Sequence, residues 1–133
     1  MQANGSHQLT LVPVYDGFDA SRGPYFSGSH PSVADIAQRQ RIAGYLRAGA
    51  IVLRTTGLDR DVVDPSRGSV VPASFRTDGR WVWSEAIEYY LTEYGLAPDE
   101  AICEHIVACD YRCPATDAES LRQAASLLLG RRS

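Results

Sequence analysis

Three cysteines and a histidine in the stretch CEHIVACDYRC are the residues whose types best suit chemistry. Thiolates and an imidazole are good zinc ligands, but Cys103, Cys109 and Cys113 include no CxxC pair. Cys109 and Cys113, four residues apart, are the pair that a disulfide would use. A cysteine nucleophile needs a nearby base, and His105 diverges from Cys103 on a helix because only two residues separate them. The odd cysteine count favours free, partly buried thiols, and we expect no cofactor.

Three aspartates lie close together in GLDRDVVDPSRG, where they suggest a site for a hard cation. The spacing of Asp59, Asp61 and Asp64 does not match an EF-hand loop, and Arg60 and Arg67 would repel a cation. We therefore expect a solvated charged loop. The chain also lacks the glycine patterns of phosphate-binding loops and the G-x-S-x-G motif of α/β-hydrolases.

An anion-binding catalytic site is the enzymatic alternative. His30 lies on a long glycine-rich loop, Arg54 at the end of a predicted strand and Arg76 beside a predicted turn. Arginines would hold an anionic substrate, and a histidine beside them would act as a general base. This alternative places His30, Arg54 and Arg76 in one pocket, with Tyr25 and Asp78 as further polar candidates.

The stretch RTDGRWVWSEAIEYYLTEYG holds both tryptophans, and tryptophan, tyrosine and arginine are the preferred anchors of protein interfaces. Trp81 and Trp83 share one face of a strand, and we expect that face to point into the core. The following helix buries a stripe of its own. Arg76, Arg80 and Tyr89 are left as the residues that packing does not need, so we predict that they bind a partner.

The elements that position these residues follow from periodicity and turn signals. Asp78-Gly79 between two β-favouring runs is a strong hairpin signal. Ser32 is a predicted helix N-cap, and Thr116 with Glu119 forms a predicted capping box. The predicted strands are 9–15, 50–55, 70–77 and 80–84, the predicted helices are 32–48, 85–94, about 98–108 and 117–130, and the segments 16–31 and 57–69 are predicted loops.

This order predicts an α+β fold, with a small antiparallel or mixed sheet, an N-terminal strand, a central hairpin and about four helices. We expect the helices to pack on one face of the sheet. A chain of 133 residues fits one domain, which we assign to residues 8–133, and residues 1–7 are interpreted as disordered or tag-like.

Charge and hydropathy narrow the class of partner. The net charge of −3 argues against a broad surface for nucleic acid or anionic membrane. The chain contains no run long and apolar enough for a membrane span, and its start lacks the pattern of a secretory signal, so we expect a cytoplasmic protein. All 13 basic residues are arginine, a bias typical of GC-rich, actinobacterial-type sequences.

The segment VPASFRTDGRWVWSEAIEYYLTEYGLAPDEAICEHI, residues 71–106, resembles a recurrent segment of small actinobacterial-type proteins. Its skeleton is R-T-D-G-x-W-x-W followed by a Tyr-Tyr helix. Some small proteins of this style accompany secreted bacterial toxins as immunity partners, and the resemblance carries no catalytic residue with it. We therefore predict a protein-binding module, an immunity or accessory protein for a basic partner. The alternative is the small enzyme described above.

Overall fold

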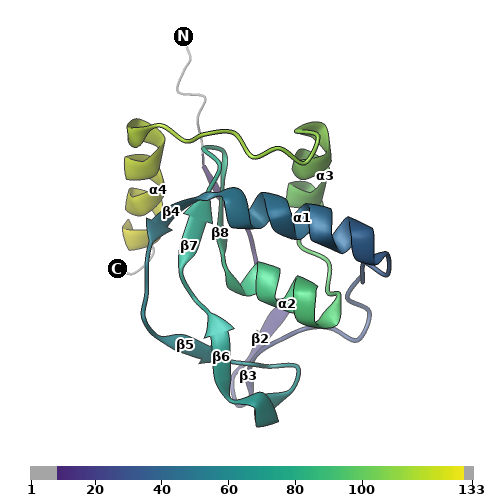
Figure 1. Cartoon of the computed structure of the whole chain (residues 1–133). Coiled ribbons are helices and arrows are strands. Elements are labelled where there is room, and N and C mark those ends of the chain that lie inside the picture. Colours follow the sequence, from purple (N-terminus) through teal and green to yellow (C-terminus); the bar gives the residue numbers. More distant parts are fainter. Residues whose placement is uncertain (1–8, 131–133) are drawn as a thin grey trace.

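A four-stranded sheet with the order β1-β8-β7-β4 lies at the centre of the fold (Figure 1). The computed structural model describes residues 9–130, so the segment interpreted as disordered or tag-like, 1–7, lies outside the described residues. β1 is parallel to β8, whereas β8, β7 and β4 pair in antiparallel fashion. The sheet is therefore mixed, with strands β1 Thr10–Leu11, β4 Ala50–Leu53, β7 Phe75–Thr77 and β8 Trp81–Ser84.

Two short antiparallel ribbons lie outside this sheet, at the bottom of Figure 1. One pairs β2 Gly17–Asp19 with β3 Gly23–Tyr25, and the other pairs β5 Leu58–Arg60 with β6 Ser69–Pro72. Both ribbons contain segments that the sequence predicted as loops. Strands of three residues show too little alternation to be recognised among glycine and proline.

The described part contains four helices, α1 Ile36–Ala48, α2 Ala86–Tyr94, α3 Glu100–Ala108 and α4 Ala118–Gly130. With the mixed sheet they confirm the predicted α+β fold. None of the helices in residues 9–130 combines the length and the apolar character that crossing a membrane requires.

Two predicted helix-capping residues are wrong. α1 is capped by Asp35, which accepts the Ala37 N–H, while Ser32 forms a β-bridge with Leu96. Thr116 donates to the Thr77 carbonyl, and the Ser120 N–H is bound by Asp117 instead. In both cases the residue that the local sequence predicts as the N-cap makes a contact with a distant part of the chain, and another residue caps the helix.

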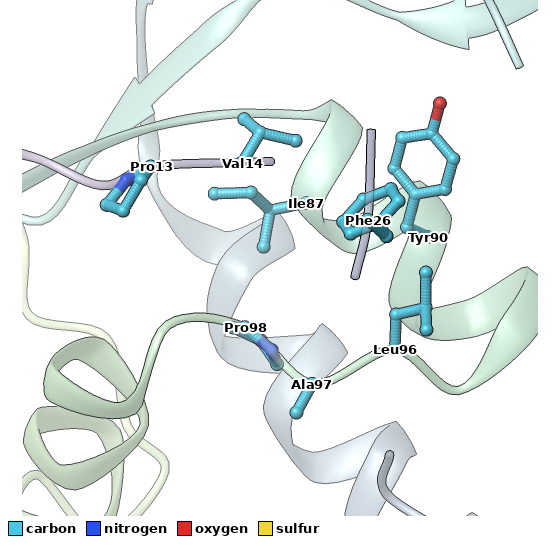
Figure 2. A pocket seen from close by; sticks show the side chains of 8 residues that line it. All are labelled: Pro13, Val14, Phe26, Ile87, Tyr90, Leu96, Ala97 and Pro98. Carbon is cyan, nitrogen blue, oxygen red and sulfur yellow. The ribbon is translucent and has the colours of Figure 1, made fainter. Parts of the chain in front are cut away.

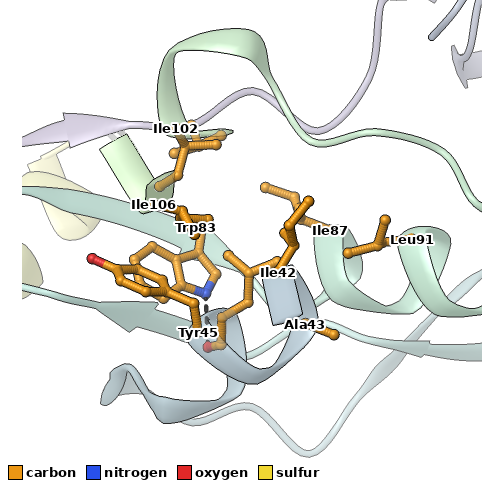
Figure 3. Close-up of a cluster of buried hydrophobic side chains, with 10 residues drawn as sticks. Ile42, Ala43, Tyr45, Trp83, Ile87, Leu91, Ile102 and Ile106 are labelled. Carbon is orange, nitrogen blue, oxygen red and sulfur yellow. Dashed lines mark hydrogen bonds between the residues drawn. The ribbon is translucent and has the colours of Figure 1, made fainter. Parts of the chain in front are cut away.

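The helices cover both faces of the sheet, and the prediction of one covered face is wrong. Trp83 of β8 is fully buried and packs with side chains of α1, α2 and α3 (Figure 3). Its indole N–H donates to the Leu46 carbonyl at 3.2 Å. The neighbouring Val82 points to the opposite face, where it packs against Ala124 and Leu128 of α4. β8 is buried on both sides, so each face needs helical cover.

The predicted hairpin is present, with its turn displaced by one residue. Thr77 pairs with Val82, and the Asp78 N–H donates to the Trp81 carbonyl, so Gly79 and Arg80 are the central residues. Gly79 has φ of 94°, a conformation that glycine adopts without strain. Asp78 is left at the start of the turn, with its side chain directed inward.

Gly49 and Gly44 provide a matched test of this packing. A Cβ at Gly49 would lie 2.5 Å from the Trp83 ring, whereas a Cβ at Gly44 would meet nothing within 4 Å. We expect Gly49→Ala to lower the free energy of unfolding by about 1–3 kcal/mol through overpacking. Gly44→Ala, on the exposed side of α1, should raise it by about 0.5–1 kcal/mol. Urea denaturation of both variants checks this, and equal effects would contradict the placement of Trp83.

Candidate functional site

Asp78 is a buried carboxylate that accepts four hydrogen bonds. Its Oδ1 accepts the backbone N–H groups of Arg80 and Trp81, at 2.9 and 2.8 Å. Its Oδ2 accepts the Tyr45 hydroxyl at 2.5 Å and lies 2.9 Å from Nε2 of His105. The side chain of Asp78 therefore joins the β7–β8 turn to α1 and α3. We call Asp78, Tyr45, His105 and Cys109 the Asp78 cluster.

Burial and the neighbouring carboxylate keep the Tyr45 hydroxyl of this cluster protonated. Burial raises the pKa of Tyr45, and the adjacent Asp78 carboxylate raises it further, so the hydroxyl remains a donor. Asp78 is 3% exposed, and the cluster reaches solvent through His105, whose side chain is 20% exposed. An ionised carboxylate accepts about four hydrogen bonds, so the four donors occupy it fully.

The Asp78 cluster contains the residue types of a Cys–His–Asp catalytic site but not its geometry. In such a site the two ring nitrogens have separate tasks, one bound to the carboxylate and the other facing the nucleophile. Here a single nitrogen, Nε2 of His105, lies 2.9 Å from Asp78 and 3.6 Å from the Cys109 sulfur. A proton donated to Asp78 from Nε2 leaves that nitrogen no lone pair to receive the thiol proton.

The other thiols are also poorly suited to act as nucleophiles or ligands. Burial raises the pKa of Cys103 to about 11, with Asp99 as the next contributor. Burial likewise raises the pKa of Cys113 to about 11, aided by the charges of Asp78 and Cys109. Both thiols are therefore protonated at neutral pH, whereas nucleophiles and metal ligands are thiolates. Within residues 9–130 no group of three or more ligand side chains is arranged to hold a metal ion.

Asp61 repeats the arrangement of Asp78 at the other end of the molecule. It is fully buried, and its Oδ1 accepts the N–H groups of Val63 and Asp64 at 2.9 and 2.8 Å. Its Oδ2 accepts the hydroxyls of Tyr89 and Tyr94 of α2, at 2.7 and 2.6 Å. Asp61 thereby fixes the loop between β5 and β6 to α2. The prediction that this aspartate lies in a solvated charged loop is wrong for Asp61, because its side chain is buried.

Arg67 completes this second group. Its guanidinium lies 3.8 Å from Asp61 and stacks over the rings of Tyr89 and Tyr94, at 5.8 and 5.7 Å from their centroids. Burial raises the pKa of Asp61, but the two tyrosines and the two amides lower it by more, so that pKa lies below its ordinary value. We call Asp61, Tyr89, Tyr94 and Arg67 the Asp61 cluster.

The predicted partner-binding residues have different surroundings. The Arg76 guanidinium binds Glu85 at 2.9 Å and the carbonyls of Arg47 and Gly49, where it caps the end of α1. Tyr89 belongs to the Asp61 cluster. The packing therefore uses Arg76 and Tyr89, and Arg80 is exposed on the β7–β8 turn.

The residues of the alternative anion site are held separately. His30 contacts Asp16 and the Ala97 carbonyl, and within residues 9–130 it shares no bonding partner with Arg76. Arg54 is exposed after β4. Burial raises the pKa of Asp16, but the Ser27 amide and the His30 ring lower it by more, so that pKa lies below its ordinary value. These positions give no support to a shared His–Arg pocket.

Figure 2 shows a small pocket between the N-terminal segment, α2 and the α2–α3 connection. Its volume is about 10 Å³, and eight side chains line it, namely Pro13, Val14, Phe26, Ile87, Tyr90, Leu96, Ala97 and Pro98. A cavity of this size holds at most one water molecule. A more open hollow of about 390 Å³, lined by Pro31, Ala97, Pro98, Glu100 and Cys103, combines mainly apolar walls with one carboxylate.

Apolar side chains, by contrast, are exposed on the two ribbons. Among residues 9–130, five of the eight exposed large hydrophobic side chains lie on the ribbons or on the loop that joins β5 to β6. They are Phe18, Tyr25, Leu58, Val63 and Val70, and we call them the ribbon residues. Phe18 is the most exposed, at 74%.

Sequence reasoning missed both aspartate clusters. It placed Asp61 in a solvated loop and Asp78 within a turn, whereas both carboxylates are buried. The buried stripe of α3 is Ile102 and Ile106, with His105 and Cys109 beside them. The local sequence holds one signal for these clusters. Each aspartate lies two and three residues before the backbone N–H groups that it accepts, which is the spacing of an Asx-turn.

Comparison of the chain with protein-family models, with curated proteins and with solved structures finds no match.

The Asp61 cluster yields a pH-dependent prediction. Because its pKa is lowered on folding, Asp61 contributes stability above the unfolded value of about 3.9 and loses that contribution as pH falls through the folded value. We expect Asp61→Asn to lower the free energy of unfolding by about 3 kcal/mol at pH 7. The difference from the unsubstituted protein should shrink below pH 4.

Asp64→Asn is the matched control, since Asp64 is exposed and asparagine caps a turn as well as aspartate does. It should change the free energy of unfolding by less than about 0.5 kcal/mol. Urea titrations between pH 3 and pH 7 provide the measurement. Equal effects of Asp61→Asn and Asp64→Asn at pH 7 would show that the buried hydrogen bonds do not carry the stability.

Proposed function

We propose that this protein is a protein-binding module whose contact surface is formed by its two β-ribbons. The observation that carries the proposal is the exposure of the ribbon residues, on two ribbons of which the β5–β6 ribbon is held against α2 by the buried carboxylate of Asp61. Exposed apolar and aromatic side chains gathered on a few elements are typical of interaction sites.

The ribbons are anchored to a common base. Tyr15 and Phe26, which flank the β2–β3 ribbon, and Val62 and Val71 of the other ribbon's region pack in one cluster around Tyr90. An isolated two-stranded ribbon is marginally stable, so this cluster stabilises both ribbons, and the Asp61 hydrogen bonds further stabilise the β5–β6 ribbon. A surface that is ordered before binding loses less conformational entropy when a partner docks.

The hydrogen bonds of the two aspartate clusters also support a binding function over a catalytic one. His105 contacts both Asp78 and Cys109 through one nitrogen, a geometry that does not fit nucleophilic catalysis, and Asp61 accepts hydrogen bonds from four donors. The side chains that resemble catalytic groups thus act in holding the fold. The two ribbons, with their exposed apolar side chains, are then the part of the surface available to a partner.

The net charge of −3 favours a basic partner, because opposite charges speed the encounter of two proteins. An immunity or accessory protein in a bacterial cytoplasm is the role that suits a small acidic binding module, and it extends the resemblance described for residues 71–106.

Substitution of the ribbon residues tests the proposal. The partner is identified by affinity capture from the native host and then purified, so that pairwise affinities can be measured. Phe18→Asp and Leu58→Asp should each weaken binding by about tenfold or more, as expected for a central apolar contact. Their melting temperatures should stay close to that of the unsubstituted protein, since both side chains are more than half exposed.

Ile36→Asp is the matched control. Ile36 is 63% exposed on α1, so this variant introduces the same charge at a comparably exposed apolar position outside the ribbons. It should bind the partner with unchanged affinity. Loss of binding in Ile36→Asp together with retention in both ribbon variants would place the interface on the helices and overturn the proposal.

A further inference from the structure

His30 joins the β2–β3 ribbon to the α2–α3 connection. Its Nδ1 lies 2.9 and 3.1 Å from the two carboxylate oxygens of Asp16, the residue directly before β2. Its Nε2 lies 2.8 Å from the carbonyl oxygen of Ala97. The Asp16 carboxylate also accepts the Ser27 N–H just after β3, so both ends of the ribbon meet at this point. We call the contacts of His30 with Asp16 and Ala97 the His30 bridge.

The number of hydrogen bonds in the His30 bridge depends on the protonation state of the ring. An ionised carboxylate and a backbone carbonyl can only accept hydrogen bonds, so both contacts are hydrogen bonds only when both ring nitrogens carry a proton. A neutral imidazole carries one N–H, and only the imidazolium carries two. The ring is 11% exposed and packs edge-on against Phe26 at 5.1 Å, so water has little access to replace a lost bond.

We propose that protonation of His30 controls the order of the β2–β3 ribbon, which is fixed to the α2–α3 connection at acidic pH and released as pH rises. The imidazolium makes both bonds of the His30 bridge. The neutral ring keeps one of them, and if it keeps the bond to Asp16, its Nε2 lone pair faces the Ala97 carbonyl oxygen.

The direction of the pH dependence follows from this count of bonds. The imidazolium makes one hydrogen bond more than the neutral ring, so the bridge is complete at acidic pH and loses one of its two bonds on deprotonation. Asp16, from the segment before β2, is the ionisable side chain in hydrogen-bonding contact with His30, and its carboxylate stays ionised throughout because its pKa is lowered. Ala97, Ser27 and Phe26 contribute two backbone carbonyls and an uncharged ring from the neighbouring segments.

The consequence for binding rests on the proposed function. The β2–β3 ribbon carries Phe18 and Tyr25, so loosening the ribbon would add an entropic cost to docking. A partner that uses this ribbon should bind less tightly as pH rises through the range in which histidine titrates, around 6.5 in an unfolded chain.

The test uses the full-length protein alone, without a partner. Nitrogen-15 NMR of the imidazole at pH 5.5 reports whether both ring nitrogens carry protons. Amide hydrogen exchange at pH 5.5 and pH 8.5, corrected for the intrinsic chemical rate, then reports the order of the ribbon. We expect two N–H groups at pH 5.5, and a rise of about tenfold in corrected exchange for residues 17–27 at pH 8.5. The amides of α1 and α2 should show no such rise.

His30→Gln is the matched variant, because a glutamine amide donates to one partner and does not titrate in this range. Its ribbon should exchange at the same corrected rate at both pH values. A neutral ring in the unsubstituted protein at pH 5.5, or equal corrected exchange at the two pH values, would overturn the proposal. The ring measurement needs no variant, so it decides the protonation state even if His30→Gln fails to fold.

Failure here is distinguishable from failure of the proposed function. If the corrected amide exchange of the β2–β3 ribbon depends on pH while Phe18→Asp leaves partner affinity unchanged, the role of the His30 bridge is supported and the assigned interface is wrong. If that exchange is independent of pH while Phe18→Asp abolishes binding, the assigned interface is supported and the regulation by His30 is wrong.

Discussion

The fold depends on a single buried carboxylate. Asp78 accepts two amides of its own turn, the Tyr45 hydroxyl of α1 and the His105 ring of α3, so one side chain positions a hairpin and two helices. Burying a charge is costly unless every hydrogen-bonding site is filled, and here all four are. Trp83, two strand positions beyond the turn, is then directed between the same helices.

Asp61 applies the same device to the opposite end of the molecule, with the amides of its own loop and two tyrosines of α2 as donors. Polar and apolar side chains therefore have different locations from those usual in a globular domain. Aspartate, tyrosine and histidine, which could serve catalysis, are used inside. Apolar side chains, which normally form the core, are exposed on the two ribbons.

The sequence was sufficient for the fold class and insufficient for the sites. The four helices and the hairpin were predictable because their apolar stripes and turn residues are local signals, and α2 ends at Tyr94, as predicted. Helical cover on both faces was not predictable, since it depends on where α4 returns to the sheet. Asp78 and His105 lie 27 positions apart, and Asp61 and Tyr89 lie 28 apart, so no local pattern reports either contact. Ser32 and Thr116 were misassigned for the same reason.

A double-mutant cycle between Asp78 and His105 tests most directly whether this cluster serves the fold. Asp78→Asn, His105→Gln and the double variant are compared by the free energy of unfolding in urea. The account predicts that each single substitution is destabilising and that the two are coupled by about 0.5–3 kcal/mol. Single substitutions that leave stability unchanged or raise it, with no coupling, would contradict the account, since that behaviour is typical of residues retained for activity at a cost in stability.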